Sequence, residues 1–211
     1  MPVNITSVKN EHIKSVMRLR DRRGRDATHL TIVEGAREIK RAIESQGSFK
    51  EFYICERFLT DSDKEILERI HSLGVDIYPT SADVFEKIAY GDRVDGLLGL
   101  YQPKKYFLKD IEEKKNIFLF IVEAVEKPGN LGAILRSCDA VGVDGVIVCD
   151  EKTDIFNPNV IRASIGAIFT NKIIVSSSQD VYLYLQKRKI TTYAATPQAQ
   201  KLYTSIDGRK S

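Results

Sequence analysis

Asn130 and Arg136 are the residues whose type and position could best carry out chemistry in this sequence of 211 residues. An amide side chain can cap a helix or contact a ligand, and a guanidinium group can stabilise a developing oxyanion. Asn130 follows an apolar run and a Lys-Pro-Gly turn. It therefore lies at the carboxyl end of a predicted strand, where ligands bind in open α/β sheets. The simpler alternatives are a helix cap for Asn130 and a solvated side chain for Arg136.

The elements that would position these two residues form a strand–helix–strand unit. Residues 117–122 are an unbroken apolar run, which is typical of a strand buried on both faces. An apolar stripe then recurs at helical spacing, at Leu131, Ile134, Leu135, Cys138 and Val141. Arg136 points nearly opposite this stripe, and Gly142 ends the predicted helix. Residues 145–149 form the next strand of a parallel sheet.

Three regions of the chain resemble one protein family. The motif N-x-G-A-x-x-R, at Asn130, Gly132, Ala133 and Arg136, resembles the first motif of the SpoU (TrmH-like) family. These are RNA ribose 2′-O-methyltransferases with a trefoil-knotted α/β fold. Residues 157–169, N-P-x-V-x-R-A-S-x-G-A-x-F, resemble the family pattern at the corresponding place. The start of the chain, S-V-K-N-x-x-I-K…R-x-R…R followed by V-E-G, is similar to the family's L30e-like substrate-binding domain.

The resemblance implies a cofactor, S-adenosyl-L-methionine, and roles for particular residues. Arg136 would activate the ribose 2′-hydroxyl. Orienting that hydroxyl and stabilising its oxyanion suit an arginine, because the guanidinium normally stays protonated. Asn130 would position the ribose or Arg136, and no metal would be needed. Ala195 and Thr196, at the end of a predicted strand, would lie near the cofactor; an ordinary strand end is the alternative.

Two further family motifs are absent before Ser211, and these form the knot and most of the cofactor pocket. The expected methyltransferase domain is therefore C-terminally incomplete. Family members are usually homodimers through the knotted region, so the family's dimer is not expected of this chain.

The N-terminal segment is basic and suggests RNA contacts. Between Lys9 and Arg25 lie seven basic residues against two acidic ones, a local charge of +5, with Lys9, Lys14, Arg18, Arg20, Arg22, Arg23 and Arg25 as the basic residues. Gly24 is expected to break a short helix here, and a basic loop can neutralise RNA phosphates. Arg162 could hold a further phosphate. The alternatives are solvated charges at the ends of helices.

The expected architecture has two α/β domains. Residues 1–102 form the L30e-like RNA-binding domain, with strands at 30–34, 49–55, 75–79 and 96–101. Residues 103–116 are polar, contain Pro103 and form a linker. Residues 117–211 form the N-terminal part of a SpoU-type domain, with parallel strands at 117–122, 145–149, 172–175 and 190–196.

Composition excludes several other classes of protein. The net charge is +3 and 43% of residues are hydrophobic, so the chain can build a core. Cys55, Cys138 and Cys149 lie at apolar positions, which predicts reduced thiols and a cytoplasmic protein. The sequence has no signal peptide, no apolar run long enough for a membrane span, no metal-like histidine spacing and no G-x-G-x-x-G motif.

The sequence thus predicts S-adenosylmethionine-dependent 2′-O-methylation of ribose in structured RNA. Ribosomal RNA is favoured over tRNA because of the N-terminal domain. One alternative is a non-catalytic RNA-binding or ribosome-associated protein with the same fold, and another is an α/β protein that binds a different small ligand. Cofactor binding distinguishes the first from the other two, and RNA binding distinguishes the second from the third.

Overall fold

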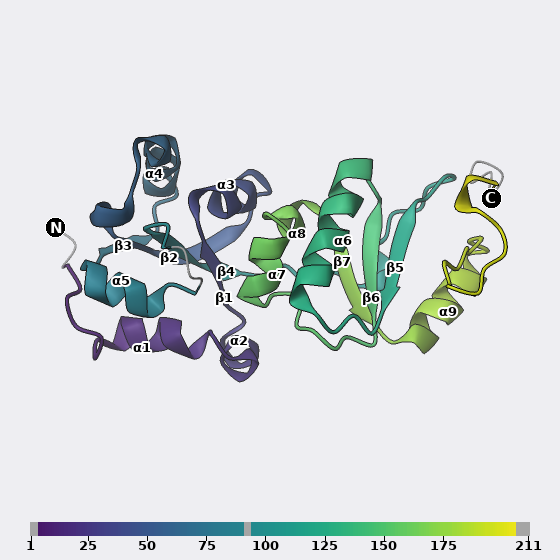
Figure 1. The fold of residues 1–211 in the computed structure, drawn as a ribbon, viewed down its shortest axis with the longest axis horizontal. Coiled ribbons are helices and arrows are strands. Elements are labelled where there is room, and N and C mark those ends of the chain that lie inside the picture. The colour runs from purple at the N-terminus through teal and green to yellow at the C-terminus, as the bar shows by residue number, and fades with distance from the viewer. Residues whose placement is uncertain (1–3, 91–93, 206–211) are drawn as a thin grey trace.

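The computed structural model describes residues 4–90 and 94–205, which form two lobes around two separate sheets (Figure 1). The first sheet has the strand order β1-β4-β2-β3. Only β2 and β3 are parallel in it, while β4 is antiparallel to both β1 and β2. Its strands are β1 (Thr31–Glu34), β2 (Ser48–Ile54), β3 (Asp76–Pro79) and β4 (Leu97–Gln102). The helices of this lobe are α1 (Glu11–Arg18), α2 (Arg22–Thr28), α3 (Ala36–Glu44), α4 (Lys64–Ser72) and α5 (Ala82–Ile88).

The second lobe is built on a parallel sheet with the order β5-β6-β7. Side chains alternate across this sheet: Val146 and Val148 pack against α6, whereas Ile147 packs against α9. The strands are β5 (Leu119–Glu123), β6 (Gly145–Cys149) and β7 (Ile173–Ser176). The helices are α6 (Pro128–Val141), α7 (Pro158–Ala163), α8 (Ala167–Thr170) and α9 (Ser178–Lys187).

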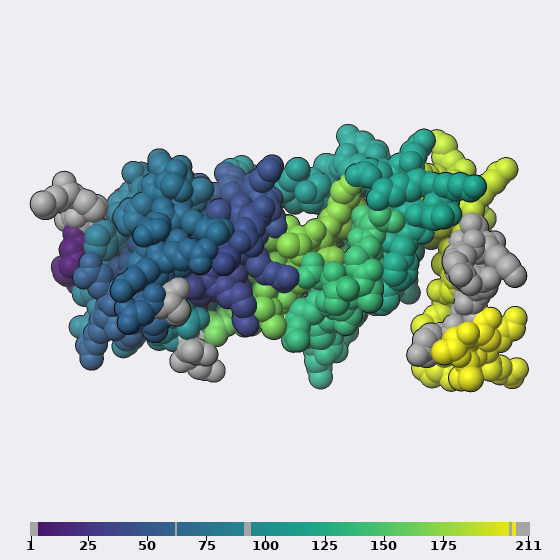
Figure 2. Space-filling view, turned by 90° about the horizontal axis from the view of Figure 1, so that it is seen from above, coloured from purple at the N-terminus to yellow at the C-terminus, as the bar shows by residue number. Residues whose placement is uncertain are grey.

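The predicted strand at residues 190–196 is wrong. This segment has no strand structure, and residues 191–202 are all exposed. They belong to the yellow segment that lies at the end of the second lobe in Figure 2. The sequence T-T-Y-A-A-T has residues that favour strands but few large apolar side chains to bury, so strand propensity alone does not bring it into the sheet. The prediction that residues 117–122 form a strand buried on both faces is also wrong, because β5 is an edge strand among the described residues: Phe118, just before it, is 51% exposed and Phe120 within it is 39% exposed.

Three local features concern where helices begin and end, and the first of them differs from the prediction. Gly24 does not break a helix but lies within α2. Residues 158–170 form the two short helices α7 and α8, because Ile165 and Gly166 between them adopt left-handed backbone conformations with φ of 56° and 76°. A capping box of Thr60 and Asp63 begins the short 3-10 helix Asp61–Asp63, directly before α4.

The segment at residues 103–116, predicted to be a linker, packs against the second sheet. It contains the short 3-10 helix Leu108–Asp110, and Tyr106 forms a parallel bridge with Ile174 of β7. Ile111 is 4% exposed within the core beneath α9. This connection is therefore fixed along the surface of the second lobe.

The two lobes share one hydrophobic core, so they are packed together and not merely tethered. Val33 and Ile39 of the first lobe belong to the same buried cluster as Val160 and Ile168 of the second. Helices α7 and α8 lie between the two sheets, as Figure 1 shows. No helix in the described ranges is long and apolar enough to cross a membrane.

Candidate functional site

Helix α6 carries both Asn130 and Arg136 and begins directly after β5. Pro128 occupies its first turn, where the missing N–H is tolerated. Lys127 is the residue at the N-cap position, so the predicted capping role of Asn130 is wrong. Asn130 lies in the first turn, its backbone N–H donates to the carbonyl oxygen of Lys127, and its side chain is exposed. The amide group is thus available to a ligand at the carboxyl end of β5.

Arg136 is exposed on α6, opposite the buried stripe, as predicted. It lies six positions after Asn130, which corresponds to about 9 Å along the helix axis and about 120° around it. The two side chains therefore do not project together from one side of the helix. A ligand that contacts both has to extend along α6, as a nucleotide with its flanking phosphates can.

Close packing against the sheet and against α7 fixes the position of α6. Leu131 and Leu135 are fully buried. A Cβ atom added at Gly132 would lie 2.4 Å from the Cβ of Ala163 in α7, closer than real Cβ atoms approach one another. Gly142 ends the helix in a left-handed conformation with φ of 67°, as the sequence predicts. The exposed residues thus stand on a helix with little freedom to move.

The N-terminal arginines divide into exposed and internally bonded groups. Arg18 and Arg23 are exposed, as an RNA contact requires. Arg20 is partly buried, and its Nη2 donates to the carbonyl oxygens of Lys87 and Ala89 at 2.7 and 2.6 Å. This side chain joins the end of α1 to the end of α5, so in this structure it holds two helices of the first lobe together.

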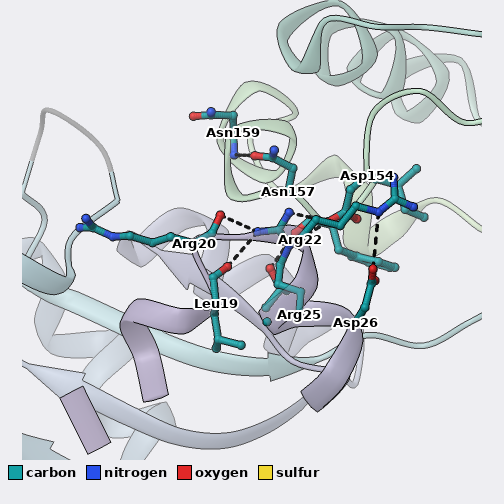
Figure 3. A network of polar contacts seen from close by, with 12 residues as sticks. Leu19, Arg20, Arg22, Arg25, Asp26, Asp154, Asn157 and Asn159 are labelled. Atoms are coloured by element: carbon teal, nitrogen blue, oxygen red, sulfur yellow. Dashed lines mark hydrogen bonds and ion pairs between the residues drawn. The ribbon is translucent and has the colours of Figure 1, made fainter. Parts of the chain in front are cut away.

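Arg22 and Arg25 of α2 contact carboxylates of the second lobe (Figure 3). Arg25 is only 6% exposed, and its Nε and Nη2 lie 2.7 and 2.6 Å from Oδ2 of Asp154. Arg22 Nη2 lies 2.7 Å from Oε2 of Glu151, whose carboxylate raises the pKa of Arg22. The predicted RNA-binding stretch therefore supplies a contact between the lobes, and Arg25 does not face the solvent.

Arg162 also lies at the boundary of the lobes. Its Nη1 is 3.6 Å from Oε2 of Glu34 in β1, and the same carboxylate oxygen accepts a hydrogen bond from the backbone N–H of Tyr90. The Arg162 side chain is 30% exposed, although its Nη1 atom is buried. Arg162 therefore contacts Glu34 of the first lobe and is partly exposed to solvent.

Sequence reasoning missed Glu151 and Asp154, the acidic partners of α2. They are three residues apart, as are Arg22 and Arg25, so the two pairs match in spacing. That matched spacing is the only signal in the sequence. A single acidic residue in a loop gives no indication of its partner, and each of these acids lies 129 residues from the arginine that it contacts.

Ala195 and Thr196 do not form a cofactor pocket in this structure. Both are exposed and lie in the coil that follows α9. A cavity of about 460 Å³ lies elsewhere, where Leu108, Ile174 and Tyr184 are part of its lining. The residues at the predicted cofactor position therefore do not fit S-adenosylmethionine as they stand. Among the described residues no group of His, Cys, Asp and Glu is arranged to hold a metal ion.

Comparison with known proteins identifies relatives of both lobes. The SpoU rRNA methylase family matches residues 117–210, and the MRM3-like substrate-binding domain matches residues 10–99. The 23S rRNA (guanosine(2553)-2′-O)-methyltransferase RlmP of Bacillus subtilis is 24% identical over 98% of this chain and 79% of the relative.

Solved structures show the same arrangement. A crystal structure of an RNA 2′-O ribose methyltransferase is 30% identical, with a TM-score of 0.82, over 97% of this chain and 77% of that one. An AdoMet-bound rRNA methyltransferase from Sinorhizobium meliloti has a TM-score of 0.78 and 23% identity, over 88% of this chain and 69% of that one, and is similar in fold.

Proposed function

The chain belongs to the SpoU rRNA methylase family, and we propose that it acts in the S-adenosylmethionine-dependent 2′-O-methylation of ribose in ribosomal RNA. The observation that carries this proposal is the 30% identity, along 97% of the chain, to an RNA 2′-O ribose methyltransferase. That similarity spans both lobes, and the B. subtilis relative acts on 23S ribosomal RNA. Ribosomal RNA is therefore the favoured substrate over tRNA.

In the proposed reaction, Arg136 contacts the ribose 2′-hydroxyl. This hydroxyl is a poor nucleophile at neutral pH and has to lose its proton as it reacts. A fixed guanidinium beside the oxygen stabilises the negative charge that develops on it. Asn130, nearer the start of α6, accepts or donates a hydrogen bond to the same nucleotide and holds it along the helix. The exposed arginines Arg18 and Arg23 contact RNA phosphates.

A second candidate function is RNA binding without catalysis, and one observation favours it. Residues 191–202, which include Ala195 and Thr196, are exposed and build no cofactor pocket. Calorimetric titration of S-adenosylmethionine into the 211-residue protein distinguishes the two functions. Micromolar binding supports the methyltransferase, whereas RNA binding without cofactor binding supports the second candidate.

Methyl transfer to RNA tests the role of Arg136 directly. The Arg136→Ala variant should lose most transfer of label from S-adenosylmethionine to 23S ribosomal RNA, because the side chain that stabilises the oxyanion is gone. The exposed position of Arg136 on α6 means that the fold should be unaffected. Ser137→Ala, at the next exposed position, is the matched control. Normal turnover in the Arg136 variant would remove this residue from the mechanism.

A cytoplasmic location and self-association complete the proposal. A ribosomal RNA substrate and the free, buried Cys55, Cys138 and Cys149 support a reducing compartment. The exposed side chains of Phe118 and Phe120 support self-association through this apolar surface, whereas the family's own dimer is not expected of this chain and the trefoil knot stays an expectation. Sedimentation analysis tests self-association; a monomer at every concentration would exclude it.

A further inference from the structure

The contact between α2 and the loop before α7 joins the two lobes at one defined place. We name Arg22, Arg25, Glu151 and Asp154 the interdomain clamp. At its centre, Arg25 donates from Nη1 to the carbonyl oxygens of Leu19 and Arg20, each at 2.8 Å, while Nε and Nη2 hold Asp154. Figure 3 shows Arg25 between these carbonyl groups on one side and Asp154 on the other. The end of α1 is thereby bonded, through one side chain, to the second lobe.

The clamp also shapes the loop that it holds. Oδ1 of Asp154 accepts the backbone N–H of Phe156 at 2.9 Å, and Oε1 of Glu151 accepts that of Ile155 at 3.1 Å. Thr31 of β1 donates to the carbonyl oxygen of Phe156 at 2.7 Å. The loop is therefore held from the first lobe by Arg22, Arg25 and Thr31, and its two carboxylates also bond its own backbone.

This loop leads directly into α7, which packs against α6, the helix that carries the candidate catalytic residues. Asn157 caps α7 by accepting the backbone N–H of Asn159 at 2.9 Å. Ala163 of α7 lies against Gly132 of α6 with no room for a methyl group between them. A displacement of the loop thus moves α7, and α7 cannot move without displacing α6.

We infer that Arg25 is a positioning residue, which fixes the orientation of the RNA-binding lobe relative to α6. The distance between bound RNA and the point of methyl transfer is then built into the fold. This inference rests on the proposed function for its effect on RNA, but the clamp itself does not. It also replaces the phosphate contact expected of Arg25, because a 6% exposed guanidinium with its donors occupied cannot reach an RNA phosphate without breaking the clamp.

Replacing Arg25 by lysine distinguishes a positioning role from a phosphate contact. Lysine keeps the positive charge but has one ammonium group, which cannot bond two carbonyl oxygens and a carboxylate in the fork geometry of arginine. A phosphate contact is therefore largely rescued in Arg25→Lys, whereas a positioning role is not. Asp154→Asn removes the charge of the partner and is a second variant that leaves Arg25 in place. Arg23→Ala, an exposed arginine of the same helix, is the control.

The first measurement is the distance between the lobes. Spin labels attached through Glu68→Cys in α4 and Ala140→Cys in α6 report it by pulsed electron paramagnetic resonance, because both positions are exposed and the native cysteines are buried. The distance distribution should broaden in Arg25→Lys and Asp154→Asn and stay narrow in Arg23→Ala. Unchanged distributions in both clamp variants would overturn the inference, whether or not the protein binds RNA.

The second measurement reports position on the RNA. Fe(II)–EDTA attached through Ala140→Cys cleaves bound 23S ribosomal RNA near α6, and the cleavage sites should spread in the clamp variants. The slope of log affinity against log salt should stay unchanged in Arg25→Lys and become shallower by about 0.7–0.9 in Arg23→Ala. A broader distance distribution with unchanged cleavage sites would mean that the clamp is only structural. If the unmodified protein does not bind RNA, the proposed function fails while the distance measurement still decides the clamp.

Discussion

Replacing Gly132 by alanine should destabilise the protein although alanine is the better helix former. The substitution favours an isolated helix by about 1 kcal/mol. At this position, however, the new Cβ would lie 2.4 Å from the Cβ of Ala163, 2.7 Å from its carbonyl carbon and 2.8 Å from the backbone nitrogen of Ser164. Two of these atoms belong to the backbone of α7, so no side-chain rotation relieves the contact. Helices α6 and α7 have to separate.

The magnitude follows from these opposing effects. Overpacking a dense core by one methyl group costs about 1–3 kcal/mol, and contact with backbone places this site toward the upper end. After the helical gain, we expect the free energy of unfolding to fall by about 1–2 kcal/mol. For a chain of this length, that corresponds to a decrease in melting temperature of about 2–8 °C.

Gly129 supplies the matched control within the same helix. A Cβ added at Gly129 meets nothing within 4 Å. Gly129→Ala should therefore stabilise the protein by about 0.4–1 kcal/mol, through the reduced freedom of the unfolded chain. Urea unfolding followed by circular dichroism measures both variants. If Gly132→Ala is as stable as Gly129→Ala, the close approach of α6 and α7 is not a feature of the protein.

Three further predictions concern charge. Hydrogen bonds from Lys114 and a backbone N–H lower the pKa of Asp144, so its contribution to stability is present at neutral pH and is lost as the pH falls below about 4; Asp144→Asn should make acid unfolding shallower in a pH titration. Burial raises the pKa of Tyr101 to about 12, so stability should fall as the pH rises above about 10, and less so in Tyr101→Phe. Arg18→Ala should reduce the salt dependence of RNA binding by about 0.7–0.9, whereas Arg20→Ala should leave it unchanged.

The regular elements could be predicted from the sequence because their patterns are local. The apolar stripe from Leu131 to Val141 and the left-handed Gly142 identify α6 without reference to the rest of the chain. Strand β6, at residues 145–149, is buried throughout, as its unbroken apolar run predicts. Gly132 is likewise recognisable from the sequence as part of the N-x-G-A-x-x-R motif. Its physical reason, the contact with Ala163, depends on two helices meeting in space.

The prediction of a strand at residues 190–196 is wrong because a strand needs a neighbouring strand to pair with, as well as residues that favour an extended backbone. Its residues favour an extended chain, but whether they join a sheet depends on which edge is open and on what they bury there. Residues 191–202 are exposed, and Phe120 of β5, an edge strand of the sheet, also remains 39% exposed. The periodicity and composition of a segment do not show which edge of a sheet is open or which side chains it would bury there.

Arginine is the residue type for which sequence alone is least informative in this chain. Its planar fork of donors suits an RNA phosphate, a protein carboxylate and a backbone carbonyl equally well. The same short stretch contains all of these outcomes: Arg23 is exposed, Arg20 bonds carbonyl groups of α5, and Arg25 holds Asp154 of the other lobe. A count of basic residues therefore overstates the RNA-binding charge of residues 9–25. Among the arginines of this stretch, the exposed charge without an ion pair to the other lobe is at Arg18 and Arg23, whereas Arg25 helps to determine where that charge lies relative to α6.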